Sequence, residues 1–130
     1  MIHQNSFSKI EHLCGEKRIT RLYTQGDAFI AYPFRVVYII NPKSDLAPAH
    51  VLISVPKKRF KRAVKRNRLK RLMREAYRLN KQPLLEKLEE KQLQLHIAFN
   101  YVSDDELDFV SIEKKIKLSL QKLIDKIDLA

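Results

Sequence analysis

The positive charge of the chain is concentrated in residues 57–81, which read K-K-R-F-K-R-A-V-K-R-N-R-L-K-R-L-M-R-E-A-Y-R-L-N-K. This stretch holds 13 of the 26 Lys and Arg residues and a single acid, Glu75. A solvated helix face normally mixes both signs of charge, and this one does not. Closely spaced cations gain most by displacing counterions from phosphates. The stretch therefore predicts a nucleic-acid-binding surface.

Groups that could hydrolyse RNA are scarce in this stretch, which has no histidine and one carboxylate. A protein that cleaves RNA needs a positioned acid–base pair or a cluster of metal-binding carboxylates. The four histidines and one cysteine are scattered, and two glycines exclude a Gly-rich phosphate loop. The one acidic cluster reads as a turn and a helix cap, and it comprises Asp104, Asp105, Glu106 and Asp108. We therefore expect no catalytic residue and no metal site on the protein.

The basic stretch has the periodicity of an amphipathic helix that begins between residues 60 and 63 and ends before Pro83. Arg66, Lys70 and Arg74 recur every four residues and share one face. Arg62 and Arg78 flank them. The apolar face is predicted to contain Val64, Leu69, Leu72, Met73, Ala76 and either Leu79 or Asn80.

The remaining chain alternates helical and strand patterns. Helical spacing of apolar residues predicts a helix over residues 16–25, with Gly26 as a left-handed residue after it, and a final helix capped by Asp108. One or two helical turns are expected in residues 83–91. Alternating, β-branched and aromatic residues predict strands over residues 28–40, with an interruption at Pro33, and over 50–55 and 93–101.

This order of elements, αβββαβα, implies an α+β two-layer sandwich in which helices cover one face of a sheet. The alternation after Pro33 places Phe34, Val36, Tyr38 and Ile40 on one face. We expect the uncovered face to be partly open, where Phe34 and Tyr38 could stack on unpaired bases. Ordinary core packing of the two rings is the alternative.

The composition favours one domain over residues 1–130, with residues 1–13 as a loosely ordered N-terminal arm. A hydrophobic content of 45% supports a packed core, and the net charge of +11 favours nucleic acid over an acidic membrane as the partner. No apolar run approaches the roughly 20 residues that span a bilayer. The single cysteine, Cys14, suits a reducing cytoplasm. No membrane and no small-molecule cofactor is expected.

The segment A-V-K-R-N-R-L-K-R-L-M-R-E-A-Y, residues 63–77, resembles the RNR signature of the bacterial ribonuclease P protein family. The preceding I-S-V-P-K-K resembles the S-V-x-K-K stretch of that family. R-L-Y-T-Q-G, residues 21–26, resembles its first helix, with Tyr23 where an aromatic residue usually stands. The resemblance covers about residues 16–127. The signature residues that match are Arg66, Asn67, Arg68, Lys70, Arg71, Arg74 and Glu75.

This resemblance implies a protein subunit of ribonuclease P, the enzyme that removes the 5′ leader from precursor tRNA. It implies that the partners are the ribonuclease P RNA and the precursor tRNA, and that the RNA binds Mg²⁺ and performs the hydrolysis. The implied fold is the ribosomal-protein-like sandwich, with a left-handed βαβ crossover around the basic helix. The leader is expected in a cleft between the first helix and the sheet.

Specific residues carry these expectations. Our hypothesis places RNA phosphates on Arg66, Arg68, Lys70, Arg71 and Arg74. Asn67 either bonds to RNA or fixes the first turns of the helix. The basic surface is extended by Lys57, Lys58, Arg59 and Arg62, and the candidates for the leader cleft are Tyr23, Phe34 and Tyr38.

Three other functions compete with this interpretation. A ribosomal or other structural RNA-binding protein could have a similar fold and take no part in cleavage. A DNA-binding basic zipper requires a heptad seam beyond the basic region, but Pro83 ends the helix. A nuclease that acts without RNA would need the acid–base or metal-binding groups that the basic stretch lacks.

Overall fold

The computed structural model describes residues 11–44 and 47–130, so most of the predicted N-terminal arm lies outside the described residues. The order of helices and strands along the chain confirms the predicted α+β class. One difference is a ten-residue helix directly after the basic helix, longer than the one or two turns expected there. The elements are α1 (Glu16–Gln25), β1 (Asp27–Ala31), β2 (Phe34–Pro42), β3 (Ala49–Ser54), α2 (Ala63–Asn80), α3 (Gln82–Lys91), β4 (Leu93–Tyr101) and α4 (Phe109–Asp128).

The strands form one four-stranded mixed sheet in the order β1-β2-β4-β3. Strands β1 and β2 are antiparallel and are separated at Pro33, as predicted, with Ala31 opposite Phe34. Strand β4 pairs antiparallel with β2 and parallel with β3. The sheet therefore joins a hairpin to one parallel pair, and that pair requires a crossover connection.

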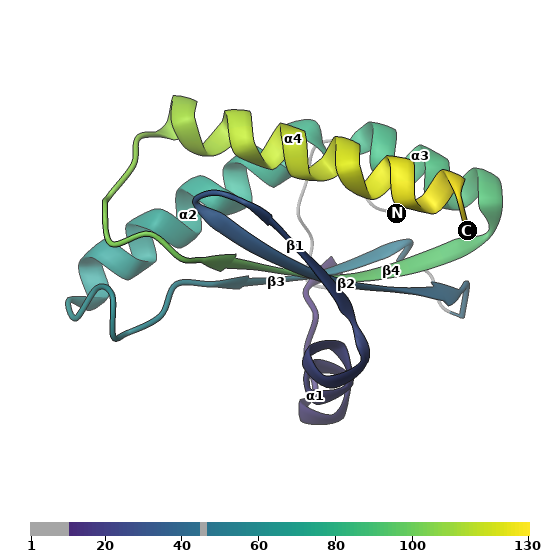
Figure 1. Ribbon diagram of the computed structural model, residues 1–130, viewed down its shortest axis with the longest axis horizontal. Coiled ribbons are helices and arrows are strands. Elements are labelled where there is room, and N and C mark those ends of the chain that lie inside the picture. The colour runs from purple at the N-terminus through teal and green to yellow at the C-terminus, as the bar shows by residue number, and fades with distance from the viewer. Residues whose placement is uncertain (1–10, 45–46) are drawn as a thin grey trace.

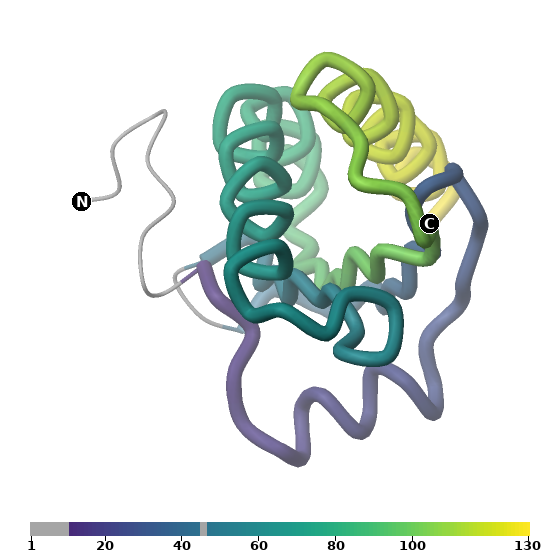
Figure 2. Tube along the Cα trace, turned by 90° about the vertical axis from the view of Figure 1, so that its left-hand side faces the viewer, coloured from purple at the N-terminus to yellow at the C-terminus, as the bar shows by residue number. Residues whose placement is uncertain are grey.

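The crossover from β3 to β4 passes through α2 and α3 and is left-handed, as the resemblance implied. Figures 1 and 2 show the chain leaving β3, running back through both helices above the sheet, and returning in β4 beside β3. Such connections are right-handed in about 98% of proteins. This uncommon path places the basic helix α2 above the outer strand β3, where much of its surface faces solvent.

Helices α2, α3 and α4 cover one face of the sheet, and α1 lies on the other (Figure 1). The main core lies beneath the three helices, and each fully buried aliphatic or aromatic side chain stabilises it by about 1.5–3 kcal/mol. Its central side chains are Leu95, Ile97, Phe99 and Tyr101 of β4, Leu69, Met73, Ala76 and Tyr77 of α2, and Ile112, Ile116, Leu120, Leu123 and Ile127 of α4.

The apolar face of α2 differs from the prediction at its beginning. Leu69, Met73 and Ala76 are buried as expected, and Tyr77 joins them although it was not predicted. Val64 was predicted to extend the face, but it is 79% exposed. The first turns of α2 project past the ends of the strands (Figure 1). A periodic pattern cannot show where the sheet beneath a helix ends, so this part of the prediction was wrong.

The glycine after α1 is required by space and not by backbone conformation. Gly26 has φ −76° and ψ 158°, so the predicted left-handed conformation was wrong. A Cβ atom at this position would lie 2.4 Å from the Leu22 carbonyl oxygen and 2.8 Å from the Tyr38 carbonyl oxygen. Glycine therefore lets the end of α1 approach β2 closely.

Candidate nucleic-acid interface

The side of α2 that faces away from the core carries most of the predicted RNA-binding residues. The burial of Leu69 and Met73 fixes the rotation of the helix. Lys70 and Arg74 then lie along one flank, while the other flank carries Lys65 and Arg68. Arg62 directly precedes the helix and has an extended backbone. Asn67 and Arg71 lie on the outward crest between the flanks. The exposed members of the predicted set are Lys57, Lys58, Arg62, Asn67, Arg68, Arg71 and Arg74, and the half-buried ones are Arg59, Arg66 and Lys70.

Arg66 holds the loop before α2 in place. Its Nη1 atom donates to the Phe60 carbonyl oxygen at 2.9 Å and to the Lys61 carbonyl oxygen at 2.8 Å. The Phe60 ring packs edge-on against Tyr101, with 5.8 Å between ring centroids. One nitrogen of the Arg66 guanidinium is thus bound to the protein backbone, and the contact of this side chain with a phosphate stays a prediction. Sequence reasoning missed this role because every residue has a backbone carbonyl, and residue types do not show which carbonyl an arginine side chain reaches.

Two carboxylates of the segment between β4 and α4 pair with the basic residues. Asp104 Oδ1 lies 2.9 Å from Arg59 Nη1, and Glu106 Oε1 lies 2.8 Å from Arg68 Nη1. Glu106 Oε2 is also 4.0 Å from Lys65 Nζ. The sequence predicted a turn and a cap here and did not predict these ion pairs. Arg59 and Arg68 therefore differ from the other cations of the predicted set, since their charge is already balanced.

The cap of α4 was predicted correctly. Asp108 Oδ1 accepts a hydrogen bond from the Ser111 backbone amide at 2.9 Å. That bond lowers the pKa of the Asp108 carboxyl, so the group is ionised at neutral pH and interacts favourably with the positive end of the helix dipole.

The last cation of the basic stretch is buried and belongs to the fold. Lys81 is 1% exposed, and its Nζ atom lies 2.8 and 2.7 Å from the two carboxylate oxygens of Glu11. Leu13, two residues later, donates from its amide to the Val51 carbonyl oxygen at 2.9 Å. Residues 11–13 of the predicted loose arm are therefore fixed against β3 and the end of α2.

Tyr23 lies on the α1 side of the sheet, and its ring is accessible. The residue is 41% exposed, and its hydroxyl donates to Asn100 Oδ1 at 2.6 Å. Asn100 in turn donates from Nδ2 to the Arg35 carbonyl oxygen at 3.1 Å. Partial burial raises the pKa of the Tyr23 hydroxyl, so it remains a hydrogen-bond donor at neutral pH. These contacts fix the ring beside the sheet with part of its surface in solvent.

The other two candidates for the leader cleft are in the core. Phe34 is 0% exposed and packs edge-on against Phe99 and Tyr101, and Tyr38 is 6% exposed beside Phe29. Their alternation along β2 was predicted correctly, but they face the three covering helices. Neither ring offers a free face to a base, so this assignment was wrong. Alternation separates two faces and does not say which of them is covered.

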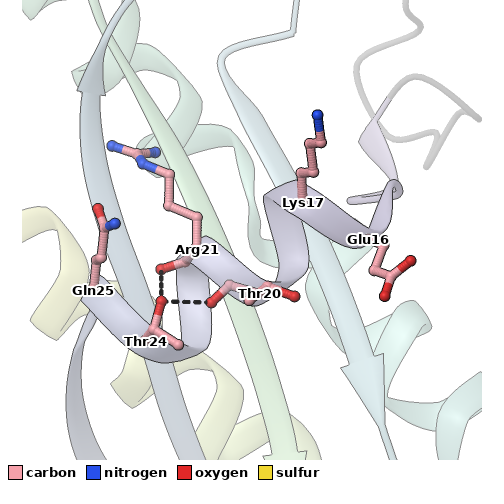
Figure 3. A pocket seen from close by; sticks show the side chains of 6 residues that line it. All are labelled: Glu16, Lys17, Thr20, Arg21, Thr24 and Gln25. Carbon is pink, nitrogen blue, oxygen red and sulfur yellow. Dashed lines mark hydrogen bonds between the residues drawn. The ribbon is translucent and has the colours of Figure 1, made fainter.

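A shallow open groove of about 490 Å³ runs along the outer side of α1, turned away from Tyr23. Figure 3 shows Lys17 and Arg21 pointing to the same side of the helix. Arg21 Nη2 donates to Asn41 Oδ1 at 2.9 Å, and Thr24 Oγ1 donates to the Thr20 carbonyl oxygen at 2.8 Å. The groove is lined by Glu16, Lys17, Thr20, Arg21, Thr24 and Gln25. Its lining includes two basic side chains and one acidic side chain, and sequence reasoning did not identify it.

Metal-binding groups and the charge of His12 both bear on the chemistry available at the basic surface. Within residues 11–44 and 47–130, no three His, Cys, Asp or Glu side chains lie close enough to hold a metal ion. His12 lies near Arg74, and the pKa of its imidazole is lowered first by burial and then by that guanidinium. It is therefore neutral at pH 7 and adds no charge to the surface. None of the helices in the described part of the chain is long and apolar enough to cross a membrane.

Comparisons with known proteins agree with this geometry. The chain is 47% identical over 116 residues to the ribonuclease P protein component of Porphyromonas gingivalis strain W83, an alignment that covers 89% of this chain and 85% of the relative. It is 38% identical over 109 residues to the ribonuclease P protein component of Chlorobium phaeobacteroides, with 78% and 75% covered.

A solved structure shares the fold. The structure of the ribonuclease P protein of Staphylococcus aureus matches with a TM-score of 0.60 and 19% identity over 88% of this chain and 97% of that one. The family model described as Ribonuclease P matches residues 7–124. With its RNR helix in the left-handed crossover, this chain belongs to the ribonuclease P protein family.

Proposed function

We propose that this chain, the protein subunit of ribonuclease P, binds the catalytic RNA through α2 and the 5′ leader of precursor tRNA beside Tyr23. The RNA subunit carries out the hydrolysis that gives the mature tRNA 5′ end. The observation that supports this most strongly is the outward side of α2. Arg71 and Arg74 are exposed there, and Arg62 is exposed directly before the helix. Among the described residues no carboxylate forms an ion pair with any of the three.

Such a surface is suited to holding phosphates. Arginine presents a planar set of donors that binds a phosphate through two hydrogen bonds. The carboxylate on α2, Glu75, is paired with Arg78, three residues further along the helix. The exposed Lys57 and Lys58 continue the positive surface onto the loop before the helix. The surface offers many phosphate contacts and no acid–base pair for cleavage.

The proposal assigns Mg²⁺ to the RNA, because the described part of the protein has no group of side chains that fits a metal ion. The protein's role is to add fixed positive charge, which screens the repulsion between the RNA subunit and its RNA substrate. Binding the leader favours precursor over product, because only the precursor has one.

Addition of the protein is therefore expected to lower the Mg²⁺ concentration needed for half-maximal cleavage severalfold. The measurement is the cleavage rate of a precursor tRNA by ribonuclease P RNA across a Mg²⁺ titration, with and without the protein. Bovine serum albumin at the same concentration controls for nonspecific protection of the RNA. An unchanged Mg²⁺ requirement would contradict the proposed role.

Replacing Tyr23 with alanine is expected to weaken binding of precursor tRNA by the reconstituted enzyme, by roughly 5- to 150-fold, because each stacked base contributes about 1–3 kcal/mol. Binding of tRNA without a leader should stay the same. Tyr23→Phe keeps the ring and loses only the hydrogen bond to Asn100, so a change within about threefold is expected. Equal losses for both RNAs in the alanine variant would show that Tyr23 does not contact the leader.

A further inference from the structure

We propose that the acidic segment Ser103–Leu107 limits where RNA binds on α2 and lowers the affinity of the protein for RNA in general. Its carboxylates balance cations on one flank of α2, so RNA is confined to the crest and the opposite flank. The segment is thus a specificity determinant of the RNA-binding surface. This inference rests on the proposed role of α2, and the experiment below separates the two.

The segment is held rigidly and is not a solvated tail. The Tyr101 hydroxyl donates to the Asp105 carbonyl oxygen at 2.6 Å and accepts from the Leu107 amide at 3.1 Å. The Ser103 hydroxyl oxygen lies 3.0 Å from the Asp105 amide and 2.8 Å from the Tyr32 hydroxyl, both of which donate to it. Tyr101 and Ser103 are fully buried. The backbone that carries the carboxylates is therefore fixed before RNA arrives.

These carboxylates reach only part of the basic surface. Glu106 contacts Arg68 at 2.8 Å and Lys65 at 4.0 Å, and both lie on the same flank of α2. Asp104 contacts Arg59 at 2.9 Å in the preceding loop. Arg71 lies on the crest and Arg74 on the other flank, and neither forms an ion pair with a described residue. The fold thus divides one basic helix into a neutralised flank and an available one.

Electrostatic repulsion disfavours the binding of RNA to the neutralised flank of α2. An exposed ion pair contributes at most about 1 kcal/mol, so a phosphate could displace Glu106 from Arg68. The displaced carboxylate would remain beside that phosphate, because its backbone is fixed. Like charges brought together in this way penalise the wrong binding mode. An RNA that uses only the available flank avoids the penalty, whereas generic RNA, which binds in many registers, does not.

The test is the double variant Asp104→Asn/Glu106→Gln, measured against a 30-nucleotide oligouridylate and against a bacterial ribonuclease P RNA. The control Glu86→Gln/Asp125→Asn makes the same change in net charge at exposed positions of α3 and α4. We expect the oligonucleotide to bind the test variant roughly 5- to 20-fold more tightly in 0.1 M KCl. The slope of log K against log salt should be steeper by about 1–2. The control should change by less than about threefold.

Ribonuclease P RNA should gain less than the oligonucleotide, so the preference for it falls. Unchanged or weaker binding of the oligonucleotide would overturn the inference, as would an equal gain for both RNAs. If the wild-type protein did not bind ribonuclease P RNA more tightly than the oligonucleotide, the proposed function would be contradicted. The effect of the acidic segment on oligonucleotide binding would still be valid. Thermal unfolding of each variant establishes that it is folded.

A double-mutant cycle tests the same inference with single changes. Arg68→Gln is expected to weaken oligonucleotide binding less than twofold in the wild-type protein, because Glu106 already balances this arginine. In the Glu106→Gln background the same change should weaken binding at least threefold, since Arg68 is then available. Equal effects in the two backgrounds would show that Glu106 does not restrict Arg68, and the inference would be wrong.

Discussion

Changing Arg62, Arg71 and Arg74 to glutamine is expected to lower the affinity of the protein for ribonuclease P RNA by about 1,000-fold or more at 0.1 M salt. All three side chains are exposed; Arg71 and Arg74 lie on the crest and on the flank of α2 away from the acidic segment, and Arg62 directly precedes the helix. A hydrogen bond between a charged group and a phosphate contributes about 1.5–3 kcal/mol, and three such contacts are lost together. Glutamine preserves helix propensity and length, so the fold should remain intact.

The salt dependence of binding separates lost phosphate contacts from a general loss of charge. Each lost contact should reduce the slope of log K against log salt by up to about 0.9, so the triple variant should lose about 2–3. The matched control is Lys114→Gln/Lys117→Gln/Lys126→Gln, which removes the same charge from exposed positions of α4. An affinity loss of similar size in the control would mean that α2 is not the RNA-binding element.

Changing Glu11 to glutamine is expected to lower the free energy of unfolding by about 3 kcal/mol or more. The change leaves the Lys81 ammonium in a site where the side chain is 1% exposed, without the carboxylate that lies 2.7 Å away. Breaking a buried ion pair by removing one partner costs about 3–5 kcal/mol, because the remaining charge is uncompensated. Urea unfolding followed by circular dichroism measures the effect.

The chain supplies a matched control for this prediction. Glu89 and Lys43 form an ion pair of the same length, 2.7 Å, but Glu89 has a side chain that is 55% exposed. Glu89→Gln should cost at most about 1 kcal/mol. A double variant, Glu11→Leu/Lys81→Met, should recover most of the stability lost in Glu11→Gln. If Glu11→Gln and Glu89→Gln lowered the free energy of unfolding equally, burial would not explain the contribution of the Glu11–Lys81 pair to stability.

Local patterns predicted the parts of the fold that depend on local chemistry. Asp108 was placed correctly as a cap because its side chain bonds to the backbone only three residues away. Pro33 predicted the break between β1 and β2, since a residue without an amide proton does not suit the interior of a sheet. The strand of residues 93–101 was recognised from a strict alternation in which every second residue enters the core. The signature of α2 additionally identified the family.

Contacts between distant residues could not be predicted in this way. Glu11 and Lys81 are 70 residues apart, and Glu106 and Arg68 are 38 apart. Residue types alone do not say which charges the fold brings together. The same limit explains why Phe34 was assigned to a binding cleft, because alternation is equally compatible with a ring that faces the core.

The most direct test of the account is to incubate precursor tRNA at low Mg²⁺ with three preparations and to measure release of the 5′ leader. The preparations are the purified protein, the ribonuclease P RNA, and the two combined. The account predicts no cleavage by the protein, slow cleavage by the RNA, and rapid cleavage by the combination. Leader release by the protein alone, with the RNA subunit verifiably absent, would contradict the claim that the protein supplies positive charge and a surface for the leader while the RNA performs the reaction.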